Sequence, residues 1–324
     1  MAVTIFNDFL KEFEQPITTF VSDSVSKLAG QVNTPLRTAV TLYVVLYGFA
    51  IMRGAVREPI MDFAWRAIRI VTVVLLATNA GQYQSYVTGL FFESLPKEIG
   101  NAIAGAGLDT SSGTPFDKLL SKGIEVAQKI YDQAGLSDIA PALVAGILMV
   151  FVAVSGFLQF AILLYAKIGL GVVLALGPLF IALALFEATR PFAEAWTRQV
   201  ANFVILHVLV VALVGLMLTT VNGFIDRYGT QAAGTGQLLV GAVAISAVLG
   251  LAAYIALQLP EIAGALAGGG ASLASRVINR TLAAPAVATG AAAAAGAWAG
   301  TRSWANAGWQ KMRTSRQGGM LSRG

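Results

Sequence analysis

The chain has 324 residues, of which 56% are apolar and only 12% are charged, and its net charge is +5. Soluble globular proteins carry about 25% charged residues, so this composition is typical of a membrane protein. Cysteine is absent and His207 is the single histidine, which excludes disulfides, thiolate metal sites and histidine-based metal clusters. We therefore expect no cofactor and no disulfide.

Residues 1–35 are expected to form amphipathic N-terminal helices. Apolar side chains recur there at spacings of three and four, which is a helical period. They are Phe6, Phe9, Phe13, Ile17, Phe20, Val25 and Leu28. Pro16 is expected to break or kink this run. Two interpretations stay open: the helices lie on the bilayer surface, or their apolar face docks on a partner.

Residues 36–92 are expected to hold the first two membrane spans. The stretch 36–52 is apolar, and residues 53–69 carry four arginines against two acids. The second span, expected at 70–92, contains Asn79, Gln82 and Gln84. Because polar groups are costly in lipid, its polar side should face protein or water.

Residues 93–139 form a hydrophilic loop with four lysines and seven acids. An amphipathic helix is predicted to begin at Thr114 and Pro115, because threonine suits a helix N-cap and proline the first helical position. Gly135 is a suitable end for this helix. Its apolar face is expected to include Phe116, Leu119, Leu120, Gly123, Ile124, Ala127, Ile130 and Tyr131.

Residues 140–259 are expected to be the transmembrane core. The stretch 140–186 is almost uncharged apart from Lys167, and the pair Gly177 and Pro178 supplies a helix break within it. Two further spans are predicted at 200–222 and 237–259, joined by a short polar linker. The segment 168–186 is expected to be a broken or re-entrant helix that does not complete a second crossing.

Three small residues recur at every fourth position in the last predicted span. They are Ala242, Ser246 and Gly250. Small side chains let membrane helices approach closely. This stripe is therefore expected to be a helix-packing face, and we expect it to join copies of the chain in a homo-oligomer.

Residues 260–324 form a tail that is rich in glycine and alanine. No acid follows Glu261, whereas seven basic residues do. The tail is expected to contact phosphate groups or anionic lipid non-specifically, without reading a DNA sequence.

The charges of the loops indicate a topology. The positive-inside rule places the arginine-rich loop and the basic tail in the cytoplasm. The loop 93–139 and the N-terminus are then outside. This arrangement requires an odd number of crossings. It therefore favours an all-α, polytopic protein with about five net crossings over one with six full spans.

The sequence contains no recognisable catalytic motif. It has no GxxxxGK[ST], HExxH or GxSxG pattern. Lys167 is expected to extend its ammonium group to a membrane edge, and His207 to pack as a hydrogen-bonded helix residue. Trp65, Tyr83 and Trp196 are interpreted as interface anchors. We expect no enzyme.

The segment GPLFIALALFEATRPFAEAWTRQVANFVI, residues 177–205, resembles the signature region of the TrbL/VirB-six family. These proteins are polytopic inner-membrane subunits of type IV secretion systems. The residues that carry the resemblance are Gly177, Pro178, Leu179, Phe180, Phe186, Phe192, Trp196 and Arg198. The layout of the whole chain resembles the conjugative, TrwI-type branch.

The resemblance implies a structural and channel-forming subunit in the bacterial inner membrane that supports transfer of single-stranded DNA with bound protein, and pilus assembly. It implies as partners the minor pilin, the VirB-eight-, VirB-ten- and VirB-three-type subunits, the assembly ATPases and, transiently, the DNA. Homo-oligomers and lipid contacts are also expected. The alternatives are a small-solute channel or secondary transporter and, less favoured, a membrane enzyme.

Two roles stay open for the corner formed by residues 177–198. Its aromatic residues either fill the gap at the helix break or seat against a partner. Arg190 and Arg198 are expected to pair with Glu187 and Glu194. In the first case the corner serves only folding, and in the second it joins subunits.

Overall fold

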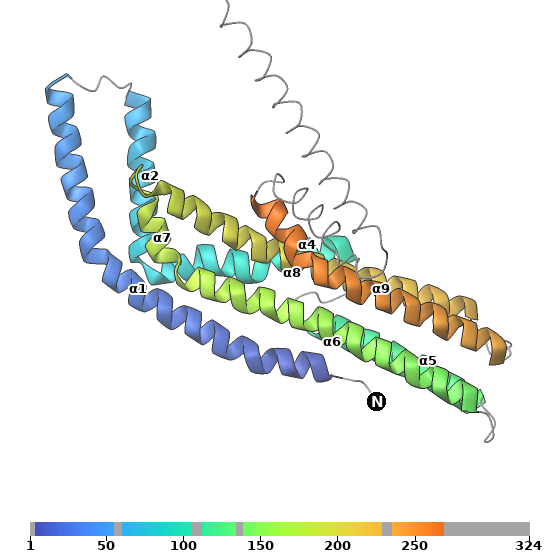
Figure 1. Ribbon diagram of the computed structural model, residues 1–324. Coiled ribbons are helices and arrows are strands. Elements are labelled where there is room, and N and C mark those ends of the chain that lie inside the picture. The colour runs from blue at the N-terminus through green and yellow to red at the C-terminus, as the bar shows by residue number, and fades with distance from the viewer. Residues whose placement is uncertain (1–3, 55–59, 105–111, 134–138, 229–234, 269–324) are drawn as a thin grey trace, which may run out of the picture. The chain divides into compact units, whose positions relative to one another are not determined.

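We describe the protein from a computed structural model, for residues 4–54, 60–104, 112–133, 139–228 and 235–268. These parts of the chain contain helices and no strand, as the sequence predicts (Figure 1). Within these described ranges, four helices are long and apolar enough to cross a membrane: α1 (Ile5–Met52), α6 (Ile139–Ala175), α8 (Arg190–Tyr228) and α9 (Thr235–Gly268). Residues 260–268, expected to begin the basic tail, are instead the last residues of α9. The rest of the tail lies outside the described residues.

The N-terminal region is one helix, α1, rather than the expected helix pair followed by a separate span. Both Pro16 and Pro35 lie inside α1. Pro16 deprives only the Glu12 carbonyl of its helical hydrogen bond, and both residues are exposed, so solvent can replace that bond. The helix therefore continues past Pro16, and the bend of α1 in Figure 1 lies farther along, beyond the middle of the helix.

The expected second span at 70–92 is not one helix. Helix α2 (Ile60–Thr78) begins ten residues earlier and ends before Asn79, whose side chain accepts a hydrogen bond from the backbone N–H of Gln82 and caps the short α3 (Ala80–Tyr83). An 11-residue π-helix, η1 (Gln84–Ser94), and α4 (Leu95–Ala104) follow. With its Asp62 and two arginines, α2 is not among the four candidate spans.

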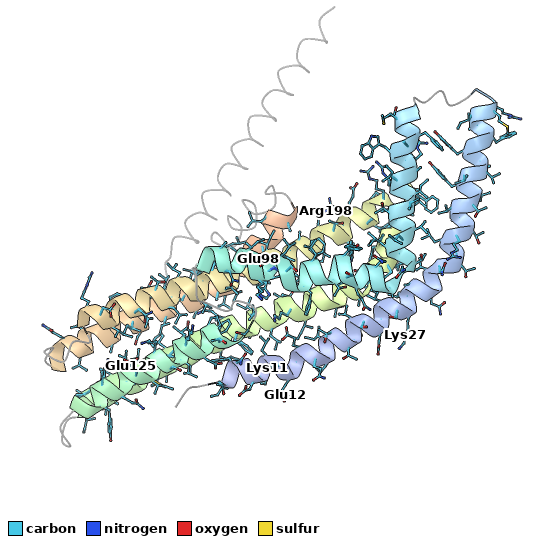
Figure 2. The ribbon with its side chains drawn as sticks, turned by 180° about the vertical axis from the view of Figure 1, so that it is seen from behind. Lys11, Glu12, Lys27, Glu98, Glu125 and Arg198 are labelled. Carbon is cyan, nitrogen blue, oxygen red and sulfur yellow. The ribbon has the colours of Figure 1, made fainter. Side chains whose placement is uncertain are left out.

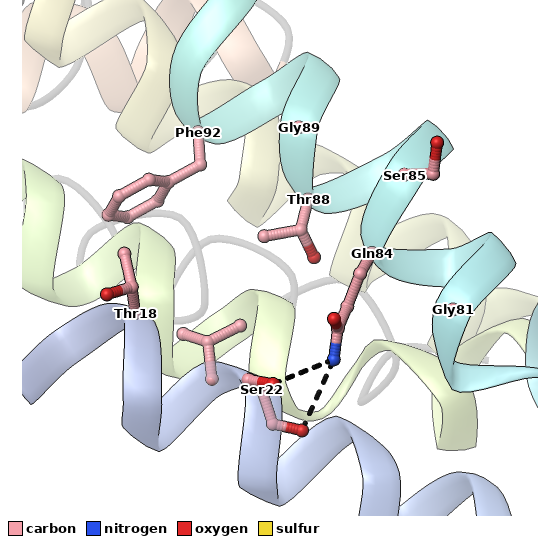
Figure 3. Close-up of a pocket in the computed structure, with 9 residues that line it drawn as sticks. Thr18, Ser22, Gly81, Gln84, Ser85, Thr88, Gly89 and Phe92 are labelled. Carbon is pink, nitrogen blue, oxygen red and sulfur yellow. Dashed lines mark hydrogen bonds between the residues drawn. The ribbon is translucent and has the colours of Figure 1, made fainter. Parts of the chain in front are cut away.

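The polar side of η1 faces α1, as expected for the least lipid-like segment. The side-chain amide of Gln84 donates to the Ser22 hydroxyl oxygen at 3.1 Å, and the Thr88 hydroxyl is buried beside it (Figure 3). These residues line a cavity of about 550 Å³ between the two elements. Long π-helices are rare in proteins and π-turns occur often at functional sites, so η1 is an unusual wall for this cavity.

The amphipathic helix of the hydrophilic loop is α5 (Thr114–Gln133), which begins at the predicted residue. It packs on α6, and a Cβ atom at Gly123 would collide with Val152 of α6. Phe116, Leu119 and Ile130 are buried as predicted, but Tyr131 is exposed. Val126, which was not assigned to the face, is buried in its place because it lies one heptad after Leu119.

The Asp117 carboxylate, in the first turn of α5, caps a different helix. Its two oxygens accept the backbone N–H groups of Phe6 and Asn7 at 2.9 and 3.0 Å, in the first turn of α1. These N–H groups have no partner within α1, and Thr4 provides no side-chain cap. Burial raises the pKa of Asp117, while the two backbone hydrogen bonds oppose that shift. The contact fixes the start of α1 against α5.

The stretch 140–186 contains the long helix α6 and the short helix α7 (Gly177–Leu183). The segment 168–186, expected to be one broken helix, is divided between them, because α6 continues to Ala175. Helix α6 has 37 residues and is therefore about 55 Å long, against about 30 Å for the bilayer core. Helices α8 and α9, of 39 and 34 residues, are similarly long, and they include residues 223–228 and 235–236 of the expected linker; its remaining residues lie outside the described part of the chain. Part of each helix must therefore lie beyond the bilayer core, unless it is steeply tilted.

The small-residue stripe of α9 is used inside the chain. Ala242 and Ser246 are buried, and a Cβ atom at Gly250 would lie 3.0 Å from the Phe151 ring of α6. The stripe is therefore a helix-packing face as expected, but it lets α9 approach α6 and α8. These residues are not available to a second copy of the chain, so the expected homo-oligomer would need a different face.

Candidate functional site: the helix break between α6 and α8

The break lies at Leu176, between α6 and the short α7 (Gly177–Leu183). Pro178 has no N–H, so the Leu174 carbonyl lacks the hydrogen bond that a continuing helix would supply. The hydroxyl of Tyr83 donates to this carbonyl at 2.7 Å, and the indole N–H of Trp196 donates to the neighbouring Val173 carbonyl at 2.8 Å. Aromatic side chains from α3 and α8 thus donate hydrogen bonds to two backbone carbonyls at the end of α6.

Close packing around the break requires glycine at position 177. A Cβ atom there would overlap the hydroxyl oxygen of Tyr83. Tyr83 is fully buried among Leu170, Leu174 and Val200. The interpretation of Tyr83 as an interface anchor is therefore wrong, because its phenol packs in the protein interior and its hydroxyl finds a backbone carbonyl.

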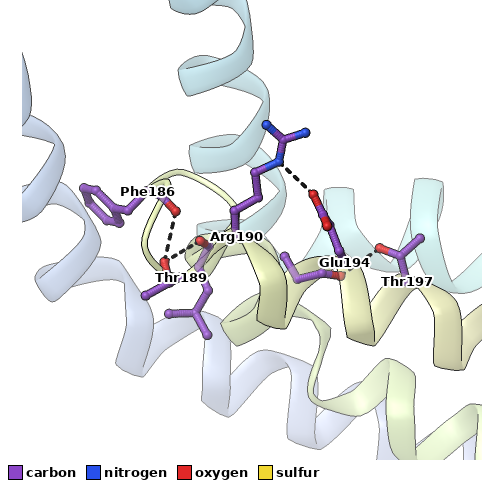
Figure 4. A network of polar contacts seen from close by, with 7 residues as sticks. Phe186, Thr189, Arg190, Glu194 and Thr197 are labelled. Atoms are coloured by element: carbon purple, nitrogen blue, oxygen red, sulfur yellow. Dashed lines mark hydrogen bonds and ion pairs between the residues drawn. The ribbon is translucent and has the colours of Figure 1, made fainter.

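The turn from α7 to α8 is held by local polar contacts (Figure 4). The Thr189 hydroxyl donates to the carbonyl of Leu183 at 2.6 Å, and the Arg190 guanidinium pairs with Glu194 at 2.9 Å. Both members of that pair are more than half exposed, so its contribution to stability is at most a few tenths of a kcal/mol. The expected pairing of arginines with acids in this corner is therefore observed for Arg190 with Glu194. Glu187 and Arg198, the other two residues of that expectation, are exposed.

The residues of the corner divide into an inward and an outward set. Gly177 and Pro178 are buried, and the ring of Phe180 stacks on Trp196 with centroids 6.4 Å apart. Leu179 and Phe192 point outward, with 39% and 59% of their surface exposed, and Phe186 is half-buried. The inward set fills the gap at the break, which leaves the outward set available for contact with lipid or a partner.

A second group of polar residues lies beneath the first turns of α1. The Lys167 ammonium of α6 is 2.9 Å from the Glu14 carboxylate of α1, and its side chain is only 5% exposed. The expectation that Lys167 extends to a membrane edge is therefore wrong, because Glu14 provides a partner inside the protein. His207 of α8 is buried beside a cavity that Glu14 and Lys167 also line. No sequence pattern linked these three residues, which are separated by up to 193 positions.

Comparison with known proteins decides the family. The family model described as TrbL/VirB6 plasmid conjugal transfer protein matches residues 40–259, which enclose the whole corner. The chain belongs to the TrbL/VirB6 family. The resemblance found in residues 177–205 is thereby confirmed.

Three curated members of the TrbL/VirB6 family illustrate the similarity. The "Type IV secretion system protein VirB6" of Bartonella henselae is 33% identical over 257 residues, which are 79% of this chain and 77% of the relative. The Bartonella quintana protein of the same name is 32% identical over 260 residues, with the same two shares. "Protein VirB6" of Agrobacterium fabrum is 27% identical over 267 residues, covering 79% of this chain and 87% of the relative.

Proposed function

We propose that the chain is a structural and channel-forming subunit of a type IV secretion system in the bacterial inner membrane. In this role it supports the transfer of single-stranded DNA with bound protein during conjugation, and the assembly of a pilus. The observation that carries the proposal is the family match over residues 40–259. We propose that it acts by assembling with other secretion subunits rather than by catalysis.

The distribution of apolar surface supports a role within an assembly. Along α1 and α2, large apolar side chains lie exposed, among them Leu46, Met52, Trp65 and Val71. A further set on α9 includes Val243, Leu251 and Tyr254. Lipid covers such surface in a membrane, and partner helices bind the same kind of surface. We propose that secretion subunits cover part of it.

The corner provides the test, because its inward and outward residues predict opposite phenotypes. Phe192→Ala should leave the level of the protein in membranes near wild type, since the ring is exposed, yet lower the frequency of plasmid transfer at least tenfold. Trp196→Ala should instead lower the protein level in step with transfer, because removing a packed aromatic costs about 3–5 kcal/mol. Transfer frequency and membrane level are measured together in a strain that lacks the wild-type gene.

The two variants control each other. If Phe192→Ala transfers plasmid as wild type does at normal abundance, the outward face of the corner joins no partner. If Trp196→Ala accumulates normally and yet fails in transfer, Trp196 contacts a partner as well as the Val173 carbonyl. Pro178→Ala, which restores an N–H to the break, should behave as Trp196→Ala does.

We further propose that the N-terminus and residues 93–139 face the periplasm and the C-terminus the cytoplasm. This topology requires a fifth crossing, by the 19-residue α2, in addition to the four candidate spans. The charges of the two loops support this orientation, because residues 53–69 carry four arginines against two acids and residues 93–139 carry seven acids against four lysines. On the polar face of α5, Lys122, Glu125 and Lys129 form two half-exposed ion pairs. The two ammonium groups hold the pKa of Glu125 below its ordinary value, so this face stays charged at neutral pH.

Cysteine labelling tests the orientation, since the chain has no native cysteine. Tyr131 is 68% exposed on α5, whereas Ser112 is partly buried and its hydroxyl donates to Thr114. Tyr131→Cys should react in intact cells with a thiol reagent that crosses only the outer membrane. Reaction only after the inner membrane is disrupted would place α5 in the cytoplasm and reverse the proposed topology.

A further inference from the structure

The cavity of about 550 Å³ between α1 and η1 is polar but uncharged, and the residues that meet at the helix break do not line it. Of the described residues that line it, none is ionisable. Its hydroxyl and amide groups come from both walls, and an aromatic ring lies at one end (Figure 3). The polar groups belong to Thr18, Ser22, Gln84, Ser85 and Thr88, and the ring to Phe92. Such a lining offers no counter-charge to an ion and no continuous apolar wall to a hydrocarbon chain.

The Thr88 hydroxyl is the group in this cavity that the protein leaves unsatisfied. Its oxygen is buried and has no hydrogen-bond partner among the described residues. Figure 3 shows the side chain pointing from η1 toward α1, into the space between the two elements. A buried hydroxyl without a partner costs about 1–3 kcal/mol. A ligand that supplies a hydrogen bond at this point would therefore recover that cost.

The neighbouring polar groups keep hydrogen-bonding capacity for a ligand. The Thr18 hydroxyl donates to the Gln15 carbonyl at 2.9 Å. The side-chain amide of Gln84 donates to the hydroxyl and carbonyl oxygens of Ser22, at 3.1 and 3.4 Å. Each of these bonds uses a donor, so the hydroxyl oxygen of Thr18 and the side-chain carbonyl of Gln84 still have acceptor capacity. The cavity thus presents a fixed set of neutral acceptors around one unmet hydroxyl.

The mouth of the cavity faces water rather than lipid. Thr18 and Ser85 are exposed at its rim. Asp23 and Lys27, which follow Ser22 along α1, are exposed as well. Because charged side chains are costly in hydrocarbon, this half of α1 lies outside the bilayer core. A ligand therefore reaches the cavity from the aqueous phase.

We propose that this cavity binds a neutral sugar of one or two rings. Sugar hydroxyls both donate and accept hydrogen bonds, so they can bond to the Thr88 hydroxyl and to the neutral acceptors beside it. The C–H face of a sugar ring can pack against an aromatic side chain, which Phe92 provides. The volume of about 550 Å³ lies within the range of about 300–1,000 Å³ for small-molecule pockets.

The full-length protein tests the site by titration calorimetry in a polyoxyethylene detergent, which contains no sugar. The probes are glucose, maltose and two charged analogues of glucose, glucuronate and glucosamine. Thr88→Val removes the unmet hydroxyl and nearly keeps the shape of the side chain, and Thr18→Phe fills the rim. The control is Thr19→Val, because Thr19 bonds to the same Gln15 carbonyl as Thr18 but does not line the cavity.

We expect glucose or maltose to bind more tightly than either charged analogue. This binding should weaken about threefold or more in Thr88→Val and about tenfold or more in Thr18→Phe, and should not change in Thr19→Val. Without sugar, Thr88→Val should unfold at the wild-type temperature or above it, since no unmet hydroxyl remains, and this separates lost binding from lost folding.

Three results would overturn the proposal. They are no binding of either neutral sugar, binding of a charged analogue that is as tight as that of glucose, and the same weakening in Thr19→Val as in Thr88→Val. Tighter binding of maltose than of glucose would support the proposal and show that the site holds two rings.

Discussion

Gly177→Ala is expected to remove most of the folded protein from the membrane. The added methyl group would overlap the phenol of Tyr83, which is fully buried and cannot swing away. Overfilling a packed interior costs about 1–3 kcal/mol. Displacing Tyr83 would also leave the Leu174 carbonyl without its donor, at a further cost of about 1–3 kcal/mol. Domains are stable by about 5–15 kcal/mol, so this one methyl group is a large change.

The matched control is Gly146→Ala in α6, the helix that ends at the break. No atom lies within 4 Å of a Cβ atom at that position, so alanine should be neutral or stabilise α6 by up to about 1 kcal/mol. The amount of protein in membranes and its unfolding temperature in detergent measure both variants. Equal stability of the two would mean that Tyr83 yields and that the packing at the break is loose.

Glu14→Ala is expected to detach the first half of α1 from the bundle. The change leaves the buried Lys167 ammonium without its carboxylate partner, and removing one member of a buried ion pair costs about 3–5 kcal/mol. The Glu14 side chain is 40% exposed, so we expect a value near the lower limit, about 3 kcal/mol. Protease cleavage within residues 5–30 should become faster in the purified protein.

Glu12 supplies the control, because it is exposed on the outer side of α1 (Figure 2). Glu12→Ala should change the unfolding free energy by no more than about 0.5 kcal/mol. Combining Glu14→Ala with Lys167→Met should recover most of the lost stability, because the buried charge is then gone as well. No recovery in the double variant would show that Glu14 stabilises α1 by some means other than its pairing with Lys167.

The helical class and the site of the break could be predicted from the sequence. Apolar periodicity and composition were enough to find the all-α class, the amphipathic helix from Thr114 and the long apolar segments. The break at Gly177 and Pro178 was predicted because proline cannot donate the backbone hydrogen bond that a continuing helix needs, and here it follows a glycine. The family resemblance came from the same short segment, residues 177–205.

Predictions for residues whose contacts or solvent exposure depend on distant parts of the sequence were less successful. Pro16 does not end a helix, because the Glu12 carbonyl that loses its helical hydrogen bond is exposed and can bind water instead. Tyr83 and Lys167 were both assigned to membrane interfaces, yet both are buried. Each has a polar end that can be satisfied either by water or by a distant group, and the sequence does not show which.

The sequence by itself determined the helical membrane class, the position of the break and the family, since these follow from local periodicity, proline chemistry and a short motif. Only the tertiary structure decided which polar groups meet. Asp117 caps α1 from 110 residues away, Tyr83 and Trp196 bond to the end of α6, and Lys167 pairs with Glu14. The physical reason is that a buried donor or acceptor must find a partner, and the packing of the helices selects that partner.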